Sequence, residues 1–372
     1  MAHDHVKLKK TIDFLNKRDL DGLIIYSNGT CNILGPKYLY YFAEFRPLGP
    51  SNAAVVAKNG ETALLVEPKW DADRAGRHSW IEDVRGTSDF SKDLADLMNA
   101  LGLNNQVGVV ASGEMTEDIY SEVEKIIRIE PVDDVIQEMA REKTEKELAI
   151  ARKAGRIADV GFETFLKHAR IGISEYELLA EMELAMRSAG ADDNFNLMSS
   201  GKHNYHMHNA TDRRLTYGDI IIGEITAACE GQFVQLCRTV VVGEPEPLLK
   251  EKYEMLAKAM DAAIQPVKSG APASQIAIAM NKVISDAGYA KYCYPPYMRA
   301  RGHGISVGTI APGGVIDDST EGTLEKDQVI VVHPNQYLPE TGYLACGETF
   351  LVTDTGFEKL SETEAKLYIK GV

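Results

Sequence analysis

The feature that most constrains the fold is a pair of long apolar hairpins in the second half of the chain. The first hairpin places two strands around a turn at Glu230-Gly231. If the connecting loop has two residues, Glu224 lies opposite Cys237 in the paired strands. The same register sets Thr226 opposite Gln235, and the alternation of side chains puts all four on one face. A shift of one residue would send them to the other face, so this register is a specific prediction.

The second hairpin brings a histidine and a glutamate together. It runs over residues 326–354, and its expected loop is Pro339–Gly342. With that loop, His333 stands directly across from Glu348. One interpretation is a buried ion pair that fixes the hairpin. Because a buried pair contributes little net stability, a functional role is the competing interpretation.

Two further histidine regions are candidates for chemistry. His303 is flanked by Gly302 and Gly304, which lets the backbone approach closely and leaves the imidazole accessible. The segment HNYHMHNA places His203, His206 and His208 in a polar loop before a strand. This spacing is compatible with metal binding and equally with a solvated loop.

The chain divides into two parts of the α/β (α+β) class. Residues 1–137 alternate helices and strands, with a hairpin whose Asn59-Gly60 pair predicts a type I′ turn. The charged stretch 138–147 begins the second domain, 138–372, with a helix predicted over 145–167. Ser174 and Glu177 form a capping box for the next helix, and two later helices follow at about 248–267 and 274–288.

Composition excludes several classes of protein. The 372 residues carry a formal net charge of −15, which disfavours a nucleic-acid binder or a protein of anionic membranes. Neither a signal peptide nor an apolar run of membrane-spanning length is visible. The five cysteines form no CxxC pair, which predicts reduced thiols and a cytoplasmic location.

With these motifs in place, the sequence resembles the creatinase/prolidase/methionine aminopeptidase superfamily, the pita-bread fold. The motifs that carry the resemblance are REKTEKELAIARKAGRIAD, HNA with Gly218-Asp219, the segment 237–247, ArgGlyHisGlyIle, and CysGlyGluThrPhe at 346–350. The resemblance implies a creatinase-like accessory domain at the N-terminus, followed by a pita-bread catalytic domain.

The same resemblance points to five positions where the peptidases of this superfamily hold two divalent ions, with two aspartates, a histidine and two glutamates. Those positions correspond here to Glu224, Gln235, His303, His333 and Glu348. Four carboxylates balance two divalent ions, whereas two remain in this set, so a dinuclear site is not expected. Two possibilities stay open: catalysis without metal, or one Fe, Zn or Mn ion held by His303, His333 and Glu348.

Roles for the remaining candidates follow from the creatinase resemblance. It makes His208 the general acid/base, since a histidine titrates near neutral pH. His303, His333 and Glu348 would polarise or orient substrate and water. Substrate-binding residues would include Glu224, Gln235 and Cys237, the last being a packed thiol or a nucleophile. Three arginines compete to grip a substrate carboxylate, namely Arg46, Arg299 and Arg301.

The main functional hypothesis is therefore a creatinase-like hydrolase that cleaves a C–N bond of a small polar carboxylate: an amidine, amide, lactam or ureido compound. The first alternative is a mononuclear-metal Xaa-Pro dipeptidase or aminopeptidase, and the second is a non-catalytic pita-bread binding protein. The resemblance also implies a homodimer in which the N-terminal domain of one subunit caps the site of the other.

Overall fold

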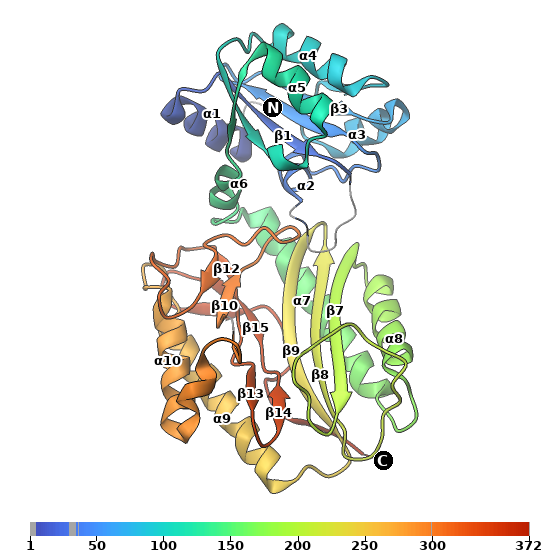
Figure 1. Ribbon diagram of the computed structural model, residues 1–372, viewed down its shortest axis with the longest axis vertical. Helices are drawn as coiled ribbons and strands as arrows, with labels where there is room; N and C mark the ends of the chain where they lie inside the picture. Colours follow the sequence, from blue (N-terminus) through green and yellow to red (C-terminus); the bar gives the residue numbers. More distant parts are fainter. Residues whose placement is uncertain (1–4, 30–34, 36, 299, 372) are drawn as a thin grey trace. The chain divides into compact units, whose positions relative to one another are not determined.

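The computed structural model describes residues 5–29, 35, 37–298 and 300–371. The chain forms two compact units (Figure 1). The first contains residues 1–140 together with 307–310, and the second contains residues 141–306 together with 311–372. Each unit has its own hydrophobic core.

The first unit is a six-stranded sheet covered by helices on both faces. Its strand order is β4-β3-β2-β1-β5-β6. The strands are β1 (Gly22–Ser27), β2 (Asn52–Ala57), β3 (Thr62–Val66), β4 (Val84–Gly86), β5 (Gln106–Val110) and β6 (Arg128–Pro131). The helices are α1 (Val6–Arg18), α2 (Tyr38–Ala43), α3 (Ala72–His78), α4 (Phe90–Ala100), α5 (Glu117–Ile126) and α6 (Asp134–Met139). Apolar residues of α1, α2 and α6 cover one face, and those of α4 and α5 cover the other.

The hairpin between β2 and β3 corrects one prediction. The strands pair with Val56 opposite Thr62, and the Ala57 amide donates to the Glu61 carbonyl, so the loop has three residues. Gly60 has φ 93°, whereas Asn59 is not among the residues with positive φ. A type I′ turn needs positive φ at both central positions, so the predicted turn type is wrong.

The second unit contains two sheets that hold the candidate site. The first sheet has the order β17-β9-β8-β7. Its strands are β7 (Asp193–Gly201), β8 (Ile220–Cys229), β9 (Gln232–Val242) and β17 (Tyr368–Lys370). Helices α7 (Glu145–His168) and α8 (Glu175–Ser188) pack against it. Both helices begin with a capping box, and the one predicted at Ser174 and Glu177 is confirmed.

The second sheet has the order β11-β10-β12-β15-β16. Its strands are β10 (Gly302–Gly304), β11 (Val315–Ile316), β12 (Val329–Val332), β15 (Glu348–Val352) and β16 (Phe357–Lys359). A separate ribbon, β13 (Gln336–Leu338) with β14 (Gly342–Leu344), connects β12 to β15. Helices α9 (Pro247–Ile264) and α10 (Ser274–Ile284) accompany this sheet. Residues 285–293 continue α10 as two irregular helical turns.

Side chains along β8 alternate between two hydrophobic cores, and this alternation defines which of them face the site. Ile221 and Ile225 belong to the core formed with α7 and α8, whereas Ile222 and Cys237 belong to the core formed with α9 and α10. We call the second side of β8 and β9 the inner face. Since side chains alternate, Glu224 shares the inner face with Ile222.

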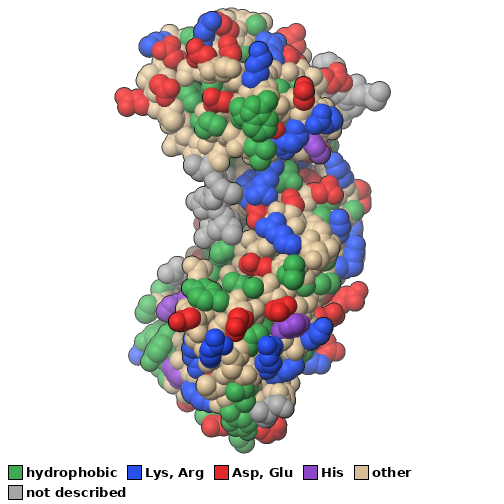
Figure 2. All heavy atoms as spheres, turned by 90° about the vertical axis from the view of Figure 1, so that its right-hand side faces the viewer, with side chains coloured by type: hydrophobic (Ala, Val, Ile, Leu, Met, Phe, Trp, Pro, Cys, Tyr) green, Lys and Arg blue, Asp and Glu red, His purple; other side chains and the backbone are tan. Residues whose placement is uncertain are grey.

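Two further features concern the charges on the surface and the apolar character of the helices. On the face shown in Figure 2, Lys and Arg side chains are interspersed with Asp and Glu side chains. Among the described residues, no helix combines the length and apolar character that crossing a membrane requires.

Candidate functional site

The predicted register of the first hairpin is confirmed. Glu224 pairs with Cys237 and Thr226 pairs with Gln235 across β8 and β9. The turn at Glu230-Gly231 has positive φ at both residues, as a two-residue hairpin loop requires. Glu224, Thr226, Gln235 and Cys237 therefore lie together on the inner face.

The predicted register of the second hairpin is wrong by one residue. Glu348 pairs with Val332, not with His333. The reason lies in the loop: Leu338 pairs with Gly342, whose φ of 77° lets the chain reverse in three residues instead of four. Continuing this register sets His333 opposite Gly347. Because side chains alternate, Glu348 points away from the face to which His333 and Gly347 belong.

Glu348 is instead half of a buried ion pair behind the site. Arg238, which follows Cys237 and so points to the opposite face of β9, donates from Nη2 to Glu348 Oε1 over 2.5 Å. Ser361 Oγ donates to Oε2 over 2.6 Å, and Lys359 Nζ lies 3.6 Å away. The side chains of Arg238 and Glu348 are 0% and 1% exposed. The predicted catalytic and metal-binding roles of Glu348 are therefore contradicted, since its oxygens are already bonded within the protein.

Gly347 occupies the place on the inner side that the sequence had assigned to Glu348. A Cβ atom on Gly347 would lie 2.9 Å from Cys237 Sγ and 3.2 Å from His333 Cδ2. The backbones of Cys237 and Gly347 exchange two hydrogen bonds of 2.9 and 3.1 Å, which join β9 to the segment before β15. No side chain other than that of glycine fits here without movement of its neighbours.

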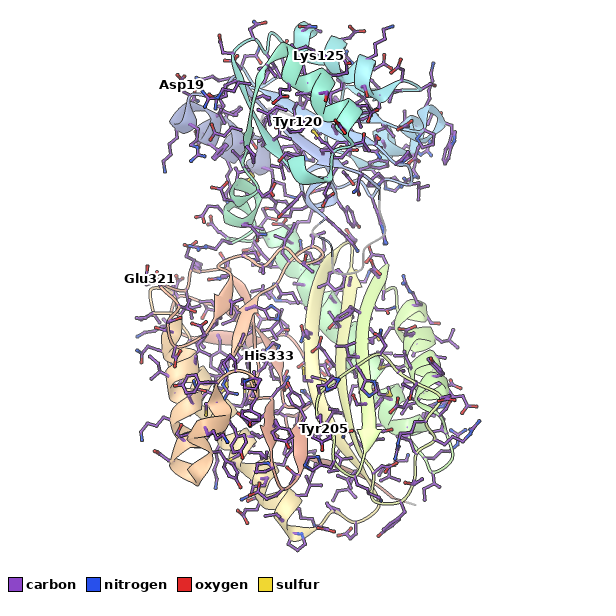
Figure 3. All side chains as sticks on the ribbon, in the orientation of Figure 1. Asp19, Tyr120, Lys125, Tyr205, Glu321 and His333 are labelled. Atoms are coloured by element: carbon purple, nitrogen blue, oxygen red, sulfur yellow. The ribbon has the colours of Figure 1, made fainter. Side chains whose placement is uncertain are left out.

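Gln235, His333 and His303 form a compact polar cluster at this junction. His333 is labelled in Figure 3. Gln235 Nε2 lies 3.2 Å from His333 Nε2, and the two imidazole rings have centroids 5.1 Å apart. His303 Nδ1 lies 2.8 Å from the Gly304 carbonyl oxygen, which makes Nδ1 the protonated nitrogen. Burial lowers the pKa of both histidines, and His333 is lowered further by the neighbouring His303 and Arg301. Both rings are neutral near pH 7.

Of the carboxylates that the structure describes, Glu224 is the one that lines the inner face beside this cluster. Burial raises the pKa of Glu224 to about 7. Its side chain makes no hydrogen bond or ion pair with the described residues, and part of its surface remains accessible. An acid in this state exchanges its proton close to neutral pH, as a general acid or base must.

Three residues near Glu224 were not among the predicted site residues. Thr226 Oγ1 is buried and has no hydrogen-bond partner among the described residues. Tyr343 lies within electrostatic range of Glu224 and Cys237, and burial raises the pKa of its hydroxyl. Asn335, which hydrogen-bonds to Tyr343, also accepts from the Cys346 amide over 2.7 Å. The predicted register had already placed Thr226 on this face, but without a functional role. Tyr343 and Asn335 come from the corrected hairpin.

The structure favours a packed thiol at Cys237. The side chain is fully buried, and burial together with the charge of Glu224 raises the pKa of its thiol. A thiol held in its protonated form is a poor nucleophile and a poor metal ligand. Gln235 Nε2 lies 3.8 Å from its sulfur.

His208 lies in a segment that runs beside the edge of β7. The Met198 amide donates to the His208 carbonyl, and the His208 amide donates to Ser199 Oγ. Met198 pairs with Gly223, the neighbour of Glu224, so two strand spacings, roughly 10 Å, separate His208 from the Glu224 strand. Its Nδ1 lies 2.7 Å from the Asn209 carbonyl oxygen.

The three candidate arginines differ. Arg301 is 2% exposed, and its guanidinium donates to Asn281 Oδ1, the Asn335 carbonyl and Gln336 Oε1. Three of its five N–H donors are bonded inside the protein and the side chain is almost inaccessible, which argues against the predicted carboxylate-binding role. Arg299 lies outside the described residues. Arg46 belongs to the first unit, where its carbonyl accepts from Arg74, and its predicted role stays a prediction.

The described residues are not arranged as a metal site. Among the described residues, no group of three or more His, Cys, Asp or Glu side chains is arranged to hold an ion. The predicted mononuclear set of His303, His333 and Glu348 is broken by the outward position of Glu348. His203, which the HNYHMHNA segment had suggested as a ligand, directs Nε2 to the Pro339 carbonyl oxygen.

Comparison with known proteins places this arrangement in a family. Residues 149–354 match the metallopeptidase family M24, and residues 7–143 match the creatinase/prolidase N-terminal domain. A protein named Xaa-Pro dipeptidase from Pyrococcus horikoshii is 27% identical over 366 residues, which cover 97% of this chain and 98% of the relative. The crystal structure of the prolidase from Pyrococcus horikoshii OT3 superposes with a TM-score of 0.83 at 27% identity, covering 97% and 99% of the two chains.

A structure titled Xaa-Pro dipeptidase from Bacillus anthracis, 23% identical, shares the fold with a TM-score of 0.85 over 98% of this chain and 99% of its own. A dipeptidase hydrolyses a C–N bond, so the predicted enzyme class is confirmed. The names of these relatives favour the Xaa-Pro peptidase alternative over the creatinase-like hypothesis. The predicted α/β class and pita-bread resemblance are also confirmed, and the chain belongs to the metallopeptidase family M24, preceded by a creatinase/prolidase N-terminal domain.

Proposed function

We propose that this protein hydrolyses the C–N bond of a small carboxylate of dipeptide size, and that Xaa-Pro dipeptides are the first substrates to test. One observation carries the proposal. Three polar groups on or beside the inner face have no hydrogen-bond partner among the described residues: the Glu224 carboxylate, Thr226 Oγ1 and His303 Nε2. The buried Thr226 hydroxyl would normally be satisfied. The Glu224 carboxylate and the His303 imidazole are only partly buried, so the three groups together can meet a polar ligand at this place. The printed names of the relatives supply the substrate class.

The chemistry needs one group that accepts a proton from water and one that donates a proton to the leaving nitrogen. His303 is neutral, with its proton on Nδ1, so Nε2 is the acceptor that orients the attacking water. Glu224, with a pKa of about 7, is protonated often enough near neutral pH to donate to the nitrogen. Thr226 Oγ1 is left to hydrogen-bond the substrate.

The test is a substrate panel run on chelator-treated protein, with and without added Mn²⁺, Co²⁺ or Zn²⁺. Xaa-Pro dipeptides, the same residues in the order Pro-Xaa, and creatine are incubated with enzyme, and released amino acids or urea are measured. Turnover of Xaa-Pro without added metal supports the proposal. Turnover only with metal favours the mononuclear peptidase. No turnover of any compound, with retained binding by calorimetry, favours the non-catalytic binding protein.

His208→Ala tests the creatinase-like assignment of the general acid/base. If His208 moves the proton, kcat falls by on the order of 10²–10⁴ while the melting temperature stays unchanged. The comparison is His206→Ala, which removes a ring centred 5.9 Å away on the same segment. Equal and small losses in both variants would leave Glu224 and His303 as the groups that transfer protons.

We also propose a cytoplasmic homodimer. The four cysteines that the structure describes are buried and unpaired, which agrees with a reducing compartment.

Sedimentation at micromolar concentration should give a dimer. Arg46→Ala should raise KM more than it lowers kcat, as expected for loss of uniform binding. A fully active monomer would exclude a role for Arg46 at a partner's site.

A further inference from the structure

We propose that this member of a metallopeptidase family has a site closed to divalent ions. A hydrogen bond to Gln235 occupies the Nε2 lone pair of His333, and the Cys237 side chain fills the space beside Gly347. The inference concerns ion binding alone and stands whether or not the proposed substrate class is correct. It rests on three independent features of the inner face: a hydrogen bond, a packing contact and a charge count.

The hydrogen bond between Gln235 and His333 removes a ligand. An imidazole binds a metal through an unprotonated nitrogen. His333 Nε2 lies 3.2 Å from the amide nitrogen of Gln235, so the amide donates and Nε2 accepts. If the amide were turned so that its oxygen faced the ring, Nε2 would have to carry a proton. In both orientations the Nε2 lone pair is unavailable to an ion.

The packing contact removes the space for a further carboxylate. Gly347 and Cys237 are joined by two backbone hydrogen bonds, which fixes their separation. A side chain at Gly347 would begin 2.9 Å from Cys237 Sγ and 3.0 Å from its Cβ. The nearest acid in sequence, Glu348, is bound to Arg238 on the other side of the strand. A small local movement cannot carry the Glu348 carboxylate to the inner face, because the whole strand would have to rotate.

The charge count removes the electrostatic driving force. Two divalent ions need about four carboxylates to balance them, and Glu224 is the one carboxylate that the described residues place on the inner face. For a single ion, the unused donors are Glu224 and His303 Nε2. Structural ions take about four ligands, and catalytic ions keep at least three from the protein. The described residues offer no such group.

The experiment measures metal content directly. Protein expressed with supplementary Mn²⁺, Co²⁺ or Zn²⁺ and purified without chelator is analysed by elemental mass spectrometry, then titrated with each ion by calorimetry. The expected result is much less than one ion per chain and no micromolar binding. An equivalent of tightly held ion in the unmodified protein would overturn the proposal.

A single substitution should reopen the site. Gln235→Asp removes the amide donor, frees His333 Nε2 and adds a carboxylate beside His303. Its affinity for Co²⁺ should exceed that of the unmodified protein by about tenfold or more, with a visible absorption band from the bound ion. The control is Gln232→Glu, which adds the same charge on the same strand beside Lys143. Gln235→Glu, closer in shape, serves if the aspartate variant does not fold.

The outcomes separate the two proposals. Folded Gln235 variants that still bind no Co²⁺, or equal binding by Gln232→Glu, would show that the Gln235–His333 bond is not what excludes ions. Metal-free protein that cleaves dipeptides supports both proposals. Metal-free protein without turnover overturns the proposed function and leaves the closed site intact.

Discussion

Replacement of Glu348 by alanine is expected to lower the free energy of unfolding by about 3–5 kcal/mol, because it leaves Arg238 as an uncompensated charge in the interior. Arg238 and Glu348 are almost completely buried, and their bond is supplemented by Ser361. Chemical denaturation of the variant measures the loss. If the variant is less stable but its folded fraction keeps a normal kcat and KM, Glu348 is structural.

The matched control is Glu358→Ala. Glu358 makes a two-armed ion pair with Arg152, but the two side chains are 39% and 38% exposed. An exposed pair contributes less than about 1 kcal/mol, so this variant should unfold almost as the parent does. Unchanged stability of Glu348→Ala together with lost turnover would instead restore Glu348 to the active site.

The second large effect is expected at Glu224. Glu224→Gln should reduce kcat by on the order of 10²–10⁴, because the amide cannot transfer a proton. With Glu224 as the proton donor, kcat of the parent should fall as the pH rises above about 7. A fall on the acid side instead would mean that Glu224 acts as a base.

The same substitution should stabilise the fold at high pH. The folded pKa of about 7 is above the ordinary value of 4.5, so the stabilising protonated form is fully present below about 4.5 and is lost as the pH rises through 7. Glutamine imitates the protonated acid at every pH. At pH 8 the variant should therefore exceed the parent by on the order of 3 kcal/mol, and the difference should vanish near pH 4. Equal melting curves at both pH values would contradict the buried, unpaired state of Glu224.

Much of the fold could be predicted because local signals were strong. Capping residues at Ser174 and Glu177 marked a helix start, and the Glu230-Gly231 turn fixed the register of β8 and β9. That register correctly placed Glu224, Gln235 and Cys237 together. Where a turn has two residues, its sequence determines which side chains share a face.

Which side chains of the second hairpin reach the site depends on the length of its loop, and the observed loop is one residue shorter than the predicted one. A three-residue loop at Pro339–Thr341 exchanges the faces of Glu348 and Gly347 relative to a four-residue loop. Nothing in the sequence PETG distinguishes the two lengths, because Gly342 is compatible with both. Glu348 would therefore not become a ligand even in the Gln235→Asp variant, because it stays bonded to Arg238 on the other face.

The junction between β9 and the segment that leads into β15 limits how the second unit can move. Beside the Cys237–Gly347 exchange, the hydroxyl of Thr349 both donates to the Gln235 carbonyl and accepts from the Gln235 amide, at 2.7 and 3.0 Å. Separating the two sheets would break all four hydrogen bonds in a water-poor interior. We therefore expect the two sheets to stay joined as long as the unit is folded. The amide protons of Gln235, Cys237 and Gly347 at this junction are accordingly expected to exchange only when the second unit unfolds.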